Sequence, residues 1–330
     1  MNGNKDLKGI LLIGDPHVQA RQPDFRRDNF AETVLRKIQW CLDYAKENCL
    51  LPAFLGDLFD HARNNRNFII VKLMEMLQGS GAVGIYGNHD CVGRQLDEND
   101  SLSILVTAGC LRLVSVDDPW VGRMNGRRVV VTGSSYREEI RHEFDPATVA
   151  SRFGPAETLF DSEPFVVWLT HEDLVLKGYD SGRCTPFQIR NVELLVNGHI
   201  HRELEPVQAG HTLWMNPGSI TRTKRSDATR EHKPHVTRVD VDMDSWEVTC
   251  VEVPHAPFEE VFYEQLIEAD PERPEGVTFA AGLKELQTRS TDTGAGLHQF
   301  IQANTDQFDE PVANELLALA AAVTNVKEPE

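Results

Sequence analysis

Short apolar runs alternate with longer amphipathic segments along the first third of the chain. The runs at 8–15, 50–57 and 82–90 each stop at a polar cluster, as a buried strand does where it leaves a core. Residues 28–48 repeat apolar positions with helical spacing, and 67–81 do the same until glycines interrupt them. This pattern predicts three strands connected by two helices.

The remaining apolar pattern is richer in strands. Further strands are predicted at 127–136, 164–173, 193–201 and 211–219. Residues 235–254 alternate apolar and polar positions on both sides of Met-Asp-Ser, which predicts a hairpin. Strands that alternate with helices favour an α/β layered fold, and the later strands favour a second, mixed sheet packed on the first.

The composition changes near residue 256, where we place a boundary between a core region, 1–256, and an acidic region, 257–330. The acidic region has 15 acidic and four basic residues, so it carries −11 of the net charge of −18. Two short helices are predicted in it, at 297–304 and 311–323. They would form either a cap on the core or a docking element for a partner.

Charge and cysteine usage narrow the class of protein. A net charge of −18 in 330 residues excludes a generic polyanion binder, so a nucleic-acid role needs local basic patches, metal ions or a partner. No apolar run approaches the length of a membrane span, and the polar N-terminus shows no secretory signal. The six cysteines form no CxxC pair, which indicates reduced thiols in a cytoplasmic protein.

Candidate metal ligands follow five of the predicted strands. In open α/β sheets, ligands bind outside the carboxyl ends of the strands, so residues at these positions are expected to meet. Gly198, in "LLVNGHIHRE", is expected to make the tight turn that brings two imidazoles to the shared site. The five clusters contain Asp15 and His17; Asp57 and Asp60; Asn88, His89 and Asp90; His171; and His199 and His201.

The ligand types indicate a two-metal site. Carboxylate, amide and imidazole groups without a thiolate suit Mn²⁺, with Fe or Zn as alternatives, whereas Ca²⁺ and Mg²⁺ favour a set richer in oxygen. The ligands are too many for one tetrahedral ion. Two ions about 3.5–4 Å apart, bridged by one carboxylate, would use them all and could polarise a phosphoryl group and activate water.

The order D-x-H, G-D-x-x-D, G-N-H-D, H and G-H-x-H across 15–201 resembles the calcineurin-like binuclear metallophosphoesterases. The resemblance implies a two-sheet αββα sandwich with the metals on loops at one edge. It implies one metal held by Asp15, His17, Asp57 and His201, and a second held by Asp57, Asn88, His171 and His199. His89 would be the general acid, oriented by Asp90. Asp60 would either steady a ligand or water, or be a helix-start carboxylate.

Within that superfamily, "GDLFDHARNN", "NGHIHRELEP" and "HAPFEEVFYE" resemble the SbcD-type DNA repair exonucleases. This branch implies a Mn-dependent exo- and endonuclease that pairs with an SbcC-like SMC-type ATPase. The resemblance covers roughly 8–264. The region after it is shorter than the usual capping and ATPase-docking region of that branch. No residue pattern selects an oligomeric state, so a homodimer is allowed.

Basic residues near the motifs offer contacts to a phosphate backbone as a set, although each alone is more typical of a solvated surface. The candidates are Arg21, Arg26, Arg63, Arg222, Lys224 and Arg225. Two alternative functions stay open at this stage. The acidic charge and short C-terminal region favour a small-molecule phosphodiesterase or phosphatase, and the paired helices at 297–323 favour a subunit that mainly docks an ATPase.

Overall fold

The computed structural model describes residues 7–23, 25–153, 163–179, 182–223, 225 and 227–263. The chain divides into two compact units, one formed by Met1–Thr221 and Lys233–Ala256, the other by Arg222–His232 and Pro257–Glu330. All strands described below belong to the first unit, which we call the core unit. The predicted boundary at residue 256 stays a prediction, and most of the predicted acidic region, including both helices at 297–323, lies outside the described residues.

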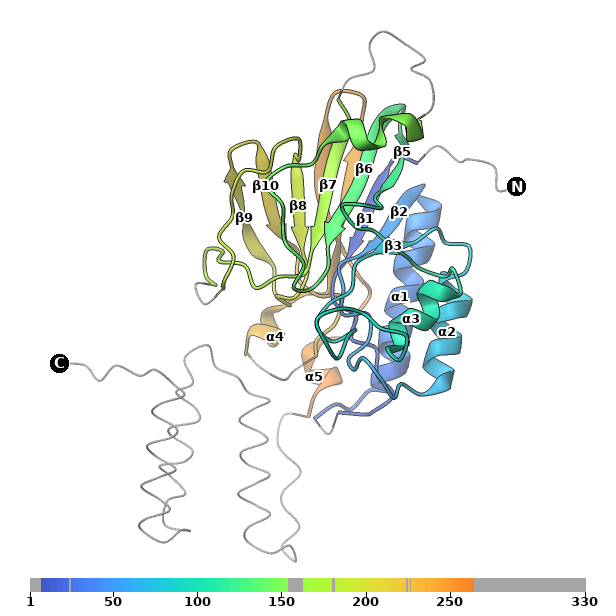
Figure 1. Cartoon of the computed structure of the whole chain (residues 1–330). Coiled ribbons are helices and arrows are strands. Elements are labelled where there is room, and N and C mark those ends of the chain that lie inside the picture. Colours follow the sequence, from blue (N-terminus) through green and yellow to red (C-terminus); the bar gives the residue numbers. More distant parts are fainter. Residues whose placement is uncertain are drawn as a thin grey trace, which may run out of the picture. The chain divides into compact units, whose positions relative to one another are not determined.

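The first sheet has the strand order β12-β11-β1-β2-β3-β4 (Figure 1). Its centre is parallel, and the hairpin is added antiparallel to β1. Its strands are β1 (Gly9–Ile13), β2 (Leu50–Phe54), β3 (Val83–Gly84), β4 (Arg112–Leu113), β11 (His235–Val241) and β12 (Trp246–Glu252). The helices that connect its strands are α1 (Phe30–Glu47), α2 (Asn67–Leu77) and α3 (Ser101–Thr107).

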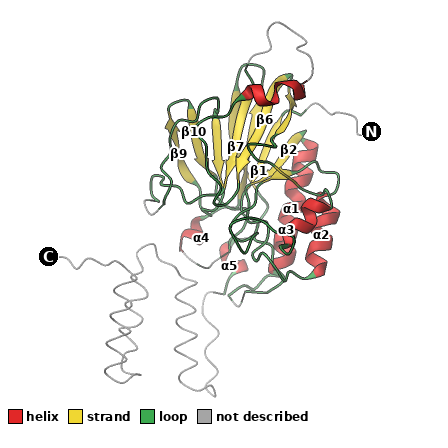
Figure 2. Cartoon of the chain, in the orientation of Figure 1, coloured by secondary structure: helices red, strands yellow, loops and turns green. Residues whose placement is uncertain are grey.

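The second sheet has the order β5-β6-β7-β8-β10-β9 and is parallel through β6, β7, β8 and β10. Its strands are β5 (Trp120–Met124), β6 (Arg127–Ser134), β7 (Phe165–Thr170), β8 (Leu194–Asn197), β9 (Leu204–Ala209) and β10 (Thr212–Asn216). The two six-stranded sheets confirm the predicted two-sheet α/β sandwich (Figure 2).

Successive side chains of β1 point to opposite faces of the sheet, so the strand contributes to two apolar cores. Ile10 and Leu12 pack between the sheets, against Val129 and Val167 of the second sheet. Leu11 and Ile13 point to the other face, where they join the buried stripe of α1. A strand covered on both faces reads as a continuous apolar run, which is why "GILLI" shows no polar alternation.

The outer face of the second sheet has a different cover. Trp168 of β7 and Trp214 of β10 are fully buried there with Phe144, Val149 and Leu174. Val149 belongs to a 3-10 helix, η1 (Pro146–Phe153), and the other two lie in loops. In the described part of the core unit, this second outer layer therefore consists of loops and one 3-10 helix rather than α-helices.

The described part of the second unit is small. It contains α4 (Asp227–Glu231) and α5 (Phe258–Val261). Arg230 joins them, since its guanidinium pairs with Glu259 at 2.8 Å and lies 4.6 Å from the ring centre of Phe258. Among the described residues, no helix has the length and apolar content that crossing a bilayer requires. All six cysteines are free thiols.

Candidate metal centre

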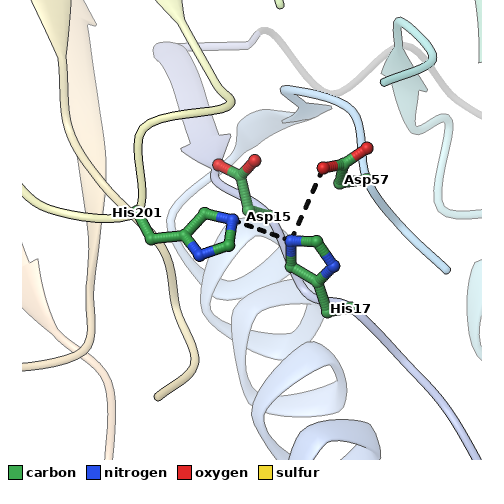
Figure 3. Close-up of side chains that lie close together, drawn as sticks. All are labelled: Asp15, His17, Asp57 and His201. Atoms are coloured by element: carbon green, nitrogen blue, oxygen red, sulfur yellow. Dashed lines mark hydrogen bonds and ion pairs between the residues drawn. The ribbon is translucent and has the colours of Figure 1, made fainter. Parts of the chain in front are cut away.

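The carboxyl ends of the central strands meet in one buried cluster. Asp15 and His17 follow β1, Asp57 follows β2, and His201 follows β8. One nitrogen or oxygen of each of these four side chains lies within 4.8 Å of the others. Figure 3 shows a ring nitrogen of His17 close to a ring nitrogen of His201 and to a carboxylate oxygen of Asp57, with Asp15 beside them. The two Nε2 atoms are 2.9 Å apart, and His17 Nε2 is 3.5 Å from Asp57 Oδ2.

A second group shares Asp57 with the first. His171 and His199 join Asp57 in a set of possible ligand atoms within the same 4.8 Å. The side-chain oxygen of Asn88 completes the set, 3.2 Å from His171 Nε2 and 2.9 Å from His199 Nδ1. Asp57 Oδ2 lies 3.3 Å from His171 Nε2. The structure thus brings together all seven residues predicted as ligands, in two groups that share one carboxylate.

The buried cluster fits two cations. Asp15 Oδ2 is buried and has no hydrogen-bond partner, although its carboxylate is fully shielded from solvent. The Nε2 atoms of His17 and His201 also lie 2.9 Å apart, with Asp57 Oδ2 3.5 Å from His17 Nε2. A buried charge and an unpaired buried oxygen are costly unless they are paired or coordinate a metal. Carboxylate, amide and imidazole donors are those that Mn, Fe or Zn take.

The backbone of the ligands is held in a rare conformation. Asp15, His17, Asp57 and His199 have φ values of 40°, 50°, 48° and 72°. Non-glycine residues seldom adopt this left-handed region, and each costs on the order of 1–3 kcal/mol. Such residues persist where the surrounding fold determines them, and they gather at functional sites. Here the sharp turn after each strand end aims its side chain at the shared centre.

Two glycines permit the close approach of these loops. A Cβ on Gly87 would lie 2.1 Å from Asp57 Oδ1, and a Cβ on Gly198 would lie 2.3 Å from the carbonyl oxygen of Leu55. The tight turn expected at Gly198 begins at this residue, since the Ile200 N–H donates to the Gly198 carbonyl oxygen at 2.8 Å, and the left-handed residue of the turn is His199. Gly198 is needed because β8 leaves the second sheet directly against the backbone that follows β2 of the first.

The motif "MNPGS" supports the ligand loops, a role the sequence did not reveal. Asn216 donates its amide hydrogens to the carbonyl oxygens of Ile200 and Arg202, both at 2.8 Å. Ser219 Oγ donates to the carbonyl oxygen of Asp15 at 2.8 Å. These contacts hold the loop of His201 and the turn of Asp15 in fixed positions.

The charges of the cluster are strongly coupled. Burial raises the pKa of Asp15 to about 6, although the charge of His171 acts in the opposite direction. Burial also acts to raise the pKa of Asp57, but His171 outweighs it and holds that pKa well below its usual range. The same attraction raises the pKa of His171 to about 9 against the effect of burial. Without metal, His171 therefore keeps a proton that a metal ion must displace.

We expect the affinity for divalent metal to rise with pH. Metal requires neutral His171 and ionised Asp15, whose pKa values are about 9 and about 6. Between pH 6 and 8, the ion held by Asp57, Asn88, His171 and His199 displaces the single His171 proton, so the affinity of that group for metal should rise about tenfold per pH unit. Calorimetric titration of the chelator-treated protein with Mn²⁺ at pH 6, 7 and 8 measures this. Two buffers with different ionisation enthalpies give the number of protons released, and an affinity independent of pH would contradict the expectation.

Asp60 contacts a predicted ligand, and its backbone contacts the predicted acid. Its carboxylate lies 3.3 Å from His17 Nδ1, which favours the ligand-steadying alternative over a helix-start carboxylate. Its carbonyl oxygen lies 2.7 Å from His89 Nδ1. The ring of His89 is in edge contact with that of His17, with centroids 4.7 Å apart. His89 is thus fixed beside the cluster with Nδ1 already occupied.

Asp90 has a different set of contacts from the one expected. Its fully buried carboxylate accepts the backbone N–H groups of Gly87 at 2.9 Å, Phe59 at 3.0 Å and Leu58 at 3.3 Å. The carbonyl of Asp60, rather than Asp90, provides the hydrogen bond that orients His89. Asp90 therefore ties the loop after β2 to the loop after β3. A catalytic role for Asp90 stays a prediction.

The residues predicted to contact phosphate have different partners and exposure. Arg26 pairs with Asp28 at 2.8 Å, and Arg63 pairs with Asp100 at 2.8 Å and with Asp97. Arg21 is exposed. In the second unit, Arg222 donates to the carbonyl oxygen of His232 and Arg225 to that of Tyr263. Lys224 lies outside the described residues. Contact of these residues with DNA stays a prediction.

The two-sheet sandwich with a nitrogen- and oxygen-rich ligand cluster at its strand ends defines an α/β protein with a candidate dimetal site. The family model of the calcineurin-like phosphoesterases matches residues 9–203, which contain every predicted ligand, and the chain belongs to this family. Members use two divalent metals and hydrolyse phosphoester bonds, so the chain is a metallophosphoesterase.

Solved structures provide distant matches. A hypothetical protein from Thermus thermophilus has 14% identity and a TM-score of 0.40, with 74% of this chain and 99% of that chain covered. A 5'-nucleotidase precursor from the same organism has 12% identity and a TM-score of 0.41, with 74% and 54% covered. A dimetal phosphatase from Danio rerio has 12% identity and a TM-score of 0.42, with 75% and 97% covered. No curated protein sequence matches the chain.

Proposed function

We propose that this metallophosphoesterase is a Mn-dependent phosphodiester hydrolase that acts on DNA. The observation that carries the hydrolase chemistry is the buried pair of ligand groups that share Asp57. Their donors suit Mn²⁺, with Fe or Zn as alternatives. The DNA substrate is supported by the likeness of the motif surroundings to the SbcD-type nucleases, such as "GDLFDHARNN" and "NGHIHRELEP".

The residues of the cluster have separable roles in such a reaction. Two bound metal ions would polarise the phosphoryl group and lower the pKa of water between them. Asp15, His17, Asp57 and His201 would hold one ion, and Asp57, Asn88, His171 and His199 the other. Asp60 keeps the ring of His17 oriented through the 3.3 Å contact with Nδ1. Asp90 keeps the loops of Asp57 and Asn88 together through its three backbone hydrogen bonds.

His89 is suited to protonate the leaving oxygen. With Nδ1 held by the carbonyl of Asp60, the ring keeps one orientation and leaves Nε2 to carry the proton that the leaving alkoxide takes. The side chain is partly exposed, so it borders the space that a substrate can enter. Its backbone N–H also donates to Asp57 Oδ1 at 2.8 Å, which links the acid to the shared ligand.

The substrate is tested by comparing DNA with a small diester. We expect the purified protein with Mn²⁺ to degrade labelled single- or double-stranded DNA and to hydrolyse bis-p-nitrophenyl phosphate, both reactions ending on addition of EDTA. Hydrolysis of the small ester without any cleavage of DNA would refute the nuclease proposal and retain the metallophosphoesterase chemistry. No hydrolysis of either substrate with Mn²⁺, Fe²⁺ or Zn²⁺ would contradict both.

A small-molecule phosphodiesterase or phosphatase is the second candidate. It is favoured by the pairing of Arg26 and Arg63 with carboxylates, since these side chains already have partners of opposite charge. The net charge of −18 also favours a small-molecule substrate, since it disfavours the binding of a polyanion such as DNA. A tenfold preference in kcat/KM for an oligonucleotide over every mononucleotide ester would count against this candidate.

A partner is a further part of the proposal. An SbcC-like SMC-type ATPase would accompany an SbcD-type nuclease, and the predicted helices at 297–323 are the candidate docking element. A homodimer and a cytoplasmic location likewise stay proposals drawn from the sequence. Co-purification of the native complex from cells that express full-length protein or a variant lacking 280–330 would test the docking element. An intact complex with the shortened variant would contradict it.

A further inference from the structure

A second polar site lies in the same unit as the ligand cluster. Arg94, Gln95, Arg137 and Glu138 line an open pocket of about 460 Å³. This volume lies within the range of small-ligand sites, about 300–1,000 Å³. The four residues stand outside the five ligand motifs and outside the set of basic residues that the sequence suggested.

The pocket is built on continuations of two ligand loops. Arg94 follows His89 by five residues, so their Cα atoms are at most about 18 Å apart. Arg137 follows β6, and its backbone N–H donates at 2.9 Å to the carboxylate of Glu172, the residue after His171. Both walls therefore lie at the carboxyl edge of the strands, where the ligand cluster also lies.

The charge of the pocket is available to a ligand. Arg94 and Arg137 are exposed, and among the residues that the structure describes neither guanidinium has a carboxylate partner. The acidic wall residue is occupied elsewhere, because Glu138 Oε1 accepts from the Tyr86 hydroxyl at 3.1 Å and Oε2 from the Ser135 N–H at 2.8 Å. Two guanidinium groups and one carboxylate leave one net positive charge here in a chain of net charge −18.

This availability distinguishes the pair from Arg26 and Arg63. The guanidinium of Arg26 is satisfied by Asp28, and that of Arg63 by Asp97 and Asp100. The ring of Tyr136 lies 5.0 Å below the guanidinium of Arg137 and supports it from one side. A guanidinium without a carboxylate partner is the group that binds phosphate oxygens with two parallel hydrogen bonds.

We propose that Arg94 and Arg137 bind a second phosphate group of the substrate, beside the phosphate that is hydrolysed. This inference rests on the proposed function, since it assumes that the ligand cluster cleaves a phosphodiester. The second phosphate is either a backbone phosphate of DNA or a terminal phosphate of a short nucleotide. In B-DNA each strand has one phosphate per about 3.4 Å of axis, so the span of at most about 18 Å between His89 and Arg94 corresponds to one of the next few phosphates along the strand.

The test compares ligands that differ by a phosphate. Binding of labelled dT12 without a terminal phosphate to the metal-loaded protein is measured by fluorescence anisotropy. The dinucleotides TpT and pTpT are then added as competitors, and their dissociation constants follow from the displacement of dT12. We expect R94Q/R137Q to weaken the binding of dT12 or pTpT about tenfold or more, as charge-assisted hydrogen bonds to phosphate are lost. Binding of TpT should change less than twofold. The slope of log affinity against log salt for dT12 should fall by about 0.7 for each lost contact.

The matched control is R36Q/K72Q, which removes the same charge from the exposed surfaces of α1 and α2. If R94Q/R137Q weakens the binding of dT12 but not of pTpT, and the control variant does neither, the pocket binds a backbone phosphate. If R94Q/R137Q weakens the binding of pTpT but not of dT12, the pocket binds a terminal phosphate. Equal affinities for wild type and R94Q/R137Q, or an equal loss for TpT, would overturn the inference. Hydrolysis of bis-p-nitrophenyl phosphate is measured separately and tests the proposed function. If the wild-type protein does not hydrolyse this ester, the proposed function fails, and not the inference about the pocket.

Discussion

Replacing Asp57 with alanine is expected to remove bound metal and reduce phosphodiester hydrolysis by more than about 10³-fold. Asp57 is the residue common to both ligand groups, with Oδ2 3.5 Å from His17 Nε2 and 3.3 Å from His171 Nε2. Loss of a single charge-stabilising donor already costs about 10²–10³ in kcat. Removal of a carboxylate that both ions share should exceed that, because the ions also supply the activated water.

Metal content by mass spectrometry and bis-p-nitrophenyl phosphate hydrolysis measure the effect together. D43N is a suitable control, since it removes one carboxylate from the exposed face of α1 and should retain wild-type metal content and rate. Circular dichroism should show that D57A keeps its fold, because the sheets and their apolar layers do not depend on this side chain. Retention of two ions per chain in folded D57A would refute the shared-ligand assignment.

Replacing His89 with asparagine is expected to slow turnover by about 10²–10⁴ while both metals stay bound. The ring of His89 is absent from both ligand groups that contain Asp57, and its Nδ1 is held by the carbonyl of Asp60. Asparagine can keep a hydrogen bond near that position but cannot donate a proton as an acid. Because p-nitrophenolate leaves without protonation, the loss should be smaller for bis-p-nitrophenyl phosphate than for a dinucleotide with an alkoxide leaving group.

The dependence on the leaving group separates an acid from a structural residue. Single-turnover rates on TpT and on bis-p-nitrophenyl phosphate give the two losses, and metal analysis of the same preparations gives the ion content. H211N provides the control, since His211 is exposed at the turn between β9 and β10. Equal losses on both substrates would argue against proton donation, and loss of metal in H89N would make His89 a ligand.

The sequence was most informative where residues of metal-ligating type follow a predicted strand. Apolar runs that stop at Gly-Asp or Asn-Gly located β1, β2 and β8, and the parallel pairing of their sheets brings these ends to one edge. The seven predicted ligands could be found because each comes after an apolar run. The helices α1 and α2 were likewise predicted to within a few residues, since their buried stripes repeat with helical spacing.

The edge strands of the second sheet and the long-range charge pairs were not predicted. In β9 only Leu204 is buried, and the strand contains Pro206. An edge strand tolerates a proline, but in the sequence a proline argues against a strand. β5, at the other edge of the same sheet, is only half-buried along most of its length and was missed too. The predicted strand at 82–90 shrinks to two residues, Val83–Gly84, because most of that run forms the ligand loop.

The partners of the arginine side chains could not be predicted from the sequence either. The pairing of Arg63 with Asp97 and Asp100 joins residues more than 30 positions apart, and nothing in the local sequence marks it. Arg137 follows a strand with no metal ligand at its end, so no motif drew attention to it. Which basic side chains are available to a phosphate depends on where the carboxylates lie in space, and that depends on the tertiary fold.

The left-handed backbone at four ligand positions has a consequence for which ion the protein carries. Hydrogen bonds from the strand ends and the close contacts of Gly87 and Gly198 fix these turns, so the polypeptide and not the ion determines the shape of the site. Metal exchange then requires no refolding, unlike in small zinc domains whose folding depends on the ion. We expect one unchanged scaffold to load Mn, Fe or Zn according to the supply of each metal.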